Sequence, residues 1–223
     1  MRKYKEELWK SHSSLKLILT VIFIAALLIS NVITWRQILL PFWITMTGAM
    51  LIFPITYILS DVFSEVYGYR WSRITCYLWF ACNLVMSLVF MVVINMEAPE
   101  YFENVGAYSI VLGNTWRVLC ASLFAYVVWD FVNDKIFQKM KAKHPHDNNW
   151  FWWRAVLSSL AWEFVDSGIF IPLAFIWTMP GKTLVIMLVT QVILKVLYEI
   201  IILPITIYVT EKTQKFEDKL WIT

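Results

Sequence analysis

Six long apolar runs occupy most of this 223-residue chain. A helix that crosses the hydrocarbon core of a bilayer needs roughly 20 mainly apolar residues, and every run reaches that length. The sequence therefore predicts an all-α, polytopic membrane protein: a single domain over residues 1–223, folded as a bundle of six transmembrane helices. The predicted spans are Leu15–Thr34, Ile38–Ser60, Ile74–Asn95, Ser109–Asp134, Trp152–Trp177 and Thr183–Val209.

Composition leaves no room for a separate soluble or nucleotide-binding domain. Hydrophobic residues make up 60% of the chain and charged residues 16%, whereas a soluble domain is about 25% charged. The first run has no A-x-A cleavage site, so we expect a membrane helix and no removable signal peptide. No H-E-x-x-H, G-x-S-x-G or glycine-rich phosphate loop occurs. We therefore expect no enzyme activity, no cofactor, no metal site and no nucleic-acid partner.

The distribution of Lys and Arg predicts the orientation, because cytoplasmic loops are enriched in these residues. Arg36 and Lys182 are the basic residues on one side, where the 95–108 loop has three acids and no basic residue. We therefore expect both termini in the cytoplasm of a cell whose plasma membrane holds the protein, the bacterial inner membrane. The cytoplasmic basic residues would be Arg2, Lys3, Lys5, Lys10, Arg70, Arg73, Lys135, Lys139, Lys141, Lys143, Lys212, Lys215 and Lys219.

Ionisable side chains inside a membrane helix are costly, so each is a candidate functional residue. Lys195 lies near the middle of the sixth run and is expected to pair with a buried carboxylate, of which Glu199 is the nearest in sequence. Arg154 is close to the inner interface, where an ordinary positive-inside anchor is the simpler interpretation. The remaining polar candidates are Asp61, Glu65, Arg117, Asp130, Asn133, Asp134, Glu163 and Asp166.

Two segments of the fourth and fifth runs repeat each other. Residues 129–134 read WDFVND and residues 162–167 read WEFVDS. In each copy an acid and an Asn or Asp stand three residues apart, on one helix face. Consecutive antiparallel helices bring such copies together from opposite directions, as in an inverted repeat around a midplane site. The functional interpretation is a polar chamber walled by Trp129 and Trp162; the alternative is polar pairing that only holds the bundle together.

Several motifs resemble the queuosine-precursor transporter family, also called the VUT family of integral membrane proteins. The most specific is FPITYILSDVFSEVYGY at 53–69; RVLCAS at 117–122 and KVLYE at 195–199 follow in the same order. Arg154, Ser158, Ser159 and Asp166 also match, and Leu203 and Pro204 close the similar region. The resemblance implies a six-helix importer of deazaguanine precursors of queuosine, a modified tRNA nucleoside.

The chain departs from that family at both copies of its repeat. Where the family usually has a small residue followed by an amide, this chain has Trp129-Asp130 and Trp162-Glu163. Carboxylates accept hydrogen bonds only, so they suit the N1–H and exocyclic amine of a guanine edge. They also suit the positive charge of an aminomethyl group at position 7.

These observations predict a transporter of a small deazapurine. Asp130 and Glu163 would bind the base edge, and Trp129 or Trp162 would stack on the ring. Asn133 and Asp166 would complete the polar wall, and Lys195 would balance charge or contact the carbonyl oxygen. Further site residues are Asp61, Glu65 and Arg117. The alternatives are a substrate-binding subunit for another heterocycle or vitamin that needs an energising complex, an intramembrane enzyme, and a structural protein. The oligomeric state, monomer or homodimer, stays open.

Overall fold

The computed structural model describes residues 13–41, 44–128, 163–176 and 178–222. Its labelled helices are α2 (Ser14–Ile33), α3 (Phe53–Val62), α4 (Tyr69–Ile94), α5 (Val105–Leu112) and α8 (Gly181–Ile222). Further helical stretches cover residues 115–128 and 163–175. A 3-10 helix, η3 (Gly48–Leu51), and a π-helix, η4 (Phe63–Tyr67), flank α3.

Four helices among the described residues are long and apolar enough to cross a membrane. They are Ser14–Ile33, Tyr69–Ile94, Val105–Val128 and Gly181–Lys219. They correspond to the first, third, fourth and sixth predicted spans. Leu84, Val85 and Leu88 of α4, among many other large apolar residues, are at least half exposed. A continuous apolar surface of this kind suits contact with lipid. The chain is thus a mainly helical membrane protein.

The second predicted span, Ile38–Ser60, is wrong over its first half. Strands β1 (Gln37–Leu40) and β2 (Ile44–Thr47) pair in a two-stranded sheet, and η3 follows. Helical structure resumes at Phe53, with Pro54 in the first turn. Proline fits there because its missing N–H group has no intrahelical partner in that position. The chain is therefore mainly helical but contains a small two-stranded sheet, and the all-α prediction is wrong for these residues.

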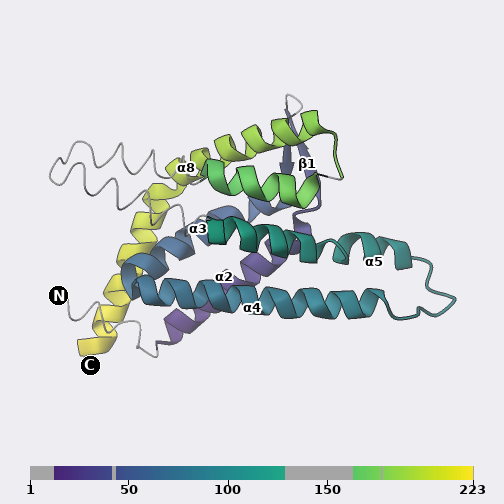
Figure 1. The fold of residues 1–223 in the computed structure, drawn as a ribbon. Helices are drawn as coiled ribbons and strands as arrows, with labels where there is room; N and C mark the ends of the chain where they lie inside the picture. Colours follow the sequence, from purple (N-terminus) through teal and green to yellow (C-terminus); the bar gives the residue numbers. More distant parts are fainter. Residues whose placement is uncertain (1–12, 42–43, 129–162, 177, 223) are drawn as a thin grey trace. The chain divides into compact units, whose positions relative to one another are not determined.

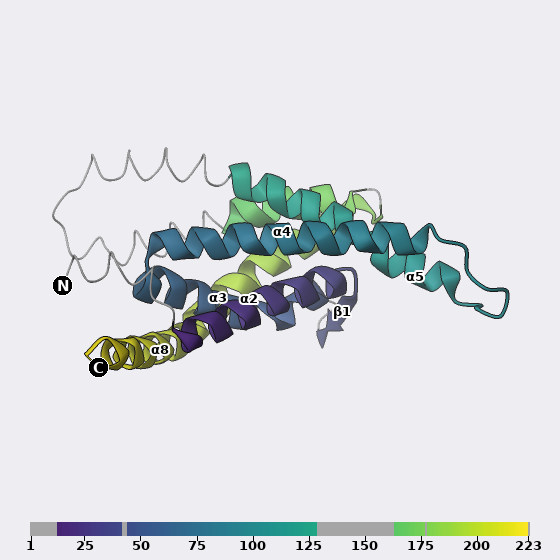
Figure 2. The same cartoon turned by 90° about the horizontal axis from the view of Figure 1, so that it is seen from below.

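The chain divides into two compact units. The first comprises Met1–Arg36, Thr47–Thr115 and Leu197–Thr223, and the second Gln37–Met46 and Trp116–Val196. In the first unit α2 packs against both α3 and α4, and η4 packs against α4 (Figure 1, Figure 2). Its buried core cluster comes mainly from the α3–η4 segment and consists of Leu59, Val62, Phe63, Val66 and Tyr67.

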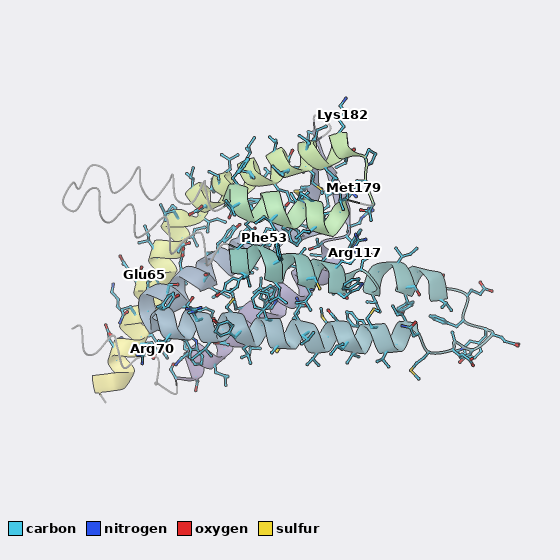
Figure 3. All side chains as sticks on the ribbon, viewed as in Figure 1. Phe53, Glu65, Arg70, Arg117, Met179 and Lys182 are labelled. Carbon is cyan, nitrogen blue, oxygen red and sulfur yellow. The ribbon has the colours of Figure 1, made fainter. Side chains whose placement is uncertain are left out.

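The chain breaks its helical path between η4 and α4. Gly68 has φ 81° and ψ 167°, a region of backbone space that is essentially open only to glycine. Tyr69, which follows, starts α4. Figure 3 shows Glu65 and Arg70 on the two sides of this break.

Candidate functional site

A buried lysine joins two carboxylates in the second unit. The Lys195 Nζ atom of α8 lies 2.8 Å from Glu163 Oε2 and 2.7 Å from Asp166 Oδ2, and it donates a hydrogen bond to the latter. The Lys195 and Glu163 side chains are 7% and 3% exposed, and that of Asp166 is 26% exposed. The helix 163–175 presents both acids because three residues make nearly one turn. Lys195 thus pairs with two acids of the preceding helix. The sequence spacing had indicated Glu199, one turn away on its own helix.

Two buried neutral polar residues share helix faces with members of the Lys195 cluster, which we define as Glu163, Asp166 and Lys195. Ser167, four residues after Glu163, is 1% exposed and its Oγ atom has no hydrogen-bond partner among the described residues. Gln191, four residues before Lys195, is 2% exposed. Residues four apart share a helix face, so this spacing was the signal in the sequence. Both residues were missed because they carry no charge.

The Lys195 cluster has two negative charges and one positive charge when its groups are ionised. Burying ions costs several kcal/mol each unless partners compensate them. The two carboxylates share the Lys195 ammonium group, and Asp166 keeps part of its side chain exposed. The cluster is therefore suited to a ligand that brings hydrogen-bond donors or a positive charge.

Arg117 lies elsewhere in the second unit, on the helical stretch 115–128 after α5 (Figure 3). It is half-buried and lines a pocket of about 310 Å³. Aromatic and aliphatic side chains form the other walls, so the guanidinium group is the charged group of a mainly apolar pocket. The other lining residues are Trp116, Cys120, Ala121, Phe124 and Leu173.

Asp61 and Glu65 belong to the first unit, at the end of α3 and in η4. Desolvation by surrounding protein atoms raises the pKa of Asp61 to about 6, and the negative charges of Glu199 and Glu65 add to the rise. The Asp61 side chain nevertheless keeps substantial surface exposure. These two acids form an acidic group within the first unit.

Four predicted site residues lie outside the described residues: Trp129, Asp130, Asn133 and Trp162. The predicted chamber between the two repeat copies therefore stays a prediction. Within the described ranges, no group of three or more His, Cys, Asp and Glu side chains is arranged to hold a metal ion.

A further buried polar group, the Lys16 cluster, consists of Lys16, Tyr67, Trp71 and Glu217 in the first unit. The Tyr67 hydroxyl group donates a 2.8 Å hydrogen bond to Glu217 Oε1. Lys16 Nζ lies 3.6 Å from the centroid of the Trp71 ring, a cation–π contact. Lys16, Tyr67 and Glu217 are at most 3% exposed. The sequence signal was a lysine two residues into the first helix, and it was overlooked.

Comparison with known proteins identifies a family. A family model described as "Putative vitamin uptake transporter" matches residues 47–209, a range that contains Asp61, Arg117 and the Lys195 cluster. No curated protein matches the chain. No solved structure matches it either.

Proposed function

This chain belongs to the family of "Putative vitamin uptake transporter" proteins, and from that membership we propose that it imports a deazaguanine precursor of queuosine. The family and the apolar helices make the protein a multi-pass membrane transporter of a small substrate. Our proposal adds the substrate, 7-aminomethyl- or 7-cyano-7-deazaguanine, and the bacterial plasma membrane as the location.

The observation that carries the proposal is the Lys195 cluster. Its acids, Glu163 and Asp166, are hydrogen-bond acceptors when ionised, and both lie within hydrogen-bonding distance of the Lys195 ammonium group. A guanine edge supplies N–H donors, and an aminomethyl group adds a positive charge that carboxylates attract. The same charges favour the aminomethyl compound over its neutral cyano analogue.

The neutral groups of the site complement the rest of a guanine-like ring. The Ser167 hydroxyl group both donates and accepts hydrogen bonds, so it suits a ring nitrogen or the carbonyl oxygen. Lys195 would contact that carbonyl oxygen when donors of the ligand replace the lysine as partners of Glu163 or Asp166. Trp129 or Trp162 would stack on the ring, which is worth about 1–3 kcal/mol per base.

Transport by the purified protein tests the proposal. Proteoliposomes that contain only this chain should accumulate radiolabelled 7-aminomethyl-7-deazaguanine above the level of empty liposomes, and unlabelled 7-cyano-7-deazaguanine should compete at higher concentration. Thiamine and riboflavin serve as unrelated heterocycles. Binding without uptake would instead identify a subunit that needs an energising complex, and absence of binding would remove the deazaguanine substrate.

A further inference from the structure

Three polar atoms without partners lie in one column on α4, in the first unit. They are Trp79 Nε1, Asn83 Nδ2 and Ser87 Oγ, all buried and without a hydrogen-bond partner among the described residues. Their residues stand four apart, so they share one face of the helix. Eight residues of α-helix rise about 12 Å, and the column thus crosses two turns of a predicted membrane span.

The middle of this column faces α2. Asn31 of α2 donates a hydrogen bond from its Nδ2 atom to Asn83 Oδ1, at 2.6 Å. Asn31 is 3% exposed, Asn83 0% and Ser87 3%. The bond to Asn31 uses only the carbonyl oxygen of Asn83, so the amide nitrogen remains as a donor in a fully enclosed position.

Leaving these donors without a hydrogen-bond partner costs more free energy inside a membrane span than it would at a protein surface. Asn83 is the fifteenth residue of the 26-residue helix α4, close to its middle, where the bilayer core offers no water. An unsatisfied polar group there costs several kcal/mol. Three such groups on one helix face would add to a larger cost. Such groups are normally satisfied by protein or by ordered water.

We propose that Trp79, Asn83 and Ser87 line a hydrated binding site beside α2 that takes neutral hydrogen-bond acceptors. An indole N–H, an amide NH₂ and a hydroxyl group all donate hydrogen bonds, and none of them carries a charge. The site therefore suits oxygen or ring-nitrogen atoms, supplied by a file of water molecules or by the transported heterocycle. This site lies in the first unit and does not depend on the Lys195 cluster of the second.

Cysteine accessibility tests the site without any knowledge of the substrate. In a chain whose Cys76, Cys82 and Cys120 are replaced by alanine, Ser87→Cys and Asn83→Cys are introduced singly. Membranes are then treated with 2-aminoethyl methanethiosulfonate, which modifies thiols that water reaches. The matched control is Val85→Cys, because Val85 is 60% exposed on the apolar face of the same helix turn. Tyr101→Cys, at an 85% exposed position, is the positive control.

A hydrated site predicts that Ser87→Cys reacts at least tenfold faster than Val85→Cys. Equal slow rates at positions 83, 85 and 87, with fast labelling at 101, would overturn the proposal. Slower labelling in saturating 7-cyano-7-deazaguanine would assign the acceptors to the transported solute, and an unchanged fast rate would assign them to water.

Thermal stability gives an independent readout that needs no labelling. In a dry interface, Ser87→Ala removes an unpaired hydroxyl group and raises the melting temperature. In a hydrated site the same change removes a hydrogen bond to water and leaves the melting temperature equal or lower. An increase in the melting temperature would contradict the proposal even if the cysteine variants fail to fold.

Discussion

Lys195 contacts two carboxylates of the helix that precedes α8, and that arrangement has a direct energetic consequence. We expect Lys195→Met to destabilise the protein by about 3–5 kcal/mol, because it removes the ammonium group paired with the buried Glu163 carboxylate. Thermal unfolding in detergent measures the change. Lys182→Met, at an exposed position, is the control and should have little effect. Equal effects of the two substitutions would mean that the Lys195 ion pairs contribute little to stability.

Glu163 is the better buried of the two acids, and its charge should select between ligands. Glu163→Gln keeps nearly the same shape and removes the negative charge. We expect it to weaken the binding of 7-aminomethyl-7-deazaguanine at least tenfold, and that of the neutral cyano analogue much less. Isothermal titration calorimetry with both ligands checks this. Equal losses would indicate that Glu163 contacts the guanine edge; no loss would leave it a structural residue.

Asp61 should make stability depend on pH. Its pKa in the folded protein is raised to about 6, so the folded state favours the protonated carboxyl group. The associated stability is fully present below the ordinary aspartate pKa and is lost as the pH rises through about 6. We therefore expect Asp61→Asn to raise the melting temperature at pH 7.5 and to change it little at pH 4. A stabilisation of the same size at both values would exclude titration of Asp61 as the cause.

At the scale of helices, η4 and the break at Gly68 direct Tyr67 toward Glu217. Tyr67→Phe should destabilise the protein by about 1.5–3 kcal/mol, the range for a hydrogen bond to a charged group. Unfolding by heat or denaturant measures the loss. Tyr69→Phe is a matched control, since the Tyr69 hydroxyl accepts an exposed hydrogen bond from Arg73. Losses of equal size would show that the buried hydrogen bond to Glu217 contributes no more to stability than the exposed one to Arg73.

Helix boundaries were predictable where a long apolar run forms a single helix. The prediction was wrong where a run includes a strand. Residues 38–52 are as apolar as a membrane helix, and hydrophobicity alone does not separate a short buried strand from a helix. The β-branched residues Ile44, Thr45 and Thr47 favour the strand conformation, and Pro54 favours a helix start. Those local signals were present in the sequence. They were outweighed by the expectation that each apolar run is one helix.

At the scale of the whole molecule, the charge distribution predicts which loops face the cytoplasm. We expect a membrane-impermeant maleimide to label Tyr101→Cys in intact cells, because the 95–108 loop contains no Lys or Arg. Lys141→Cys, in the basic segment outside the described residues, should react only after permeabilisation. The opposite pattern would invert the predicted topology.

The sequence identified the charged members of the Lys195 cluster and missed buried neutral residues, both on the two helices of that cluster and on α4. Glu163, Asp166 and Lys195 are conspicuous because charge inside a membrane span is costly. Which of them meet is decided by packing between two consecutive helices, whereas sequence spacing pointed to Glu199 on the same helix. Ser167, Gln191, Asn83 and Ser87 carry no charge. These residues are recognised as candidates by their burial in the structure, and burial cannot be read from a sequence pattern.

The π turn of η4 also sets the angular phase of the residues it contains. An α-helix advances about 100° per residue, since 3.6 residues complete a turn, and the i→i+5 bonds of a π turn need more residues for the same rotation. Continuing α3 as plain α-helix would thus rotate Tyr67 about the axis and carry its hydroxyl group away from Glu217. A substitution in Phe63–Tyr67 changes the size of one side chain, whereas a deletion of one residue redirects all those that follow. The length of this segment is therefore under a stricter physical constraint than its composition.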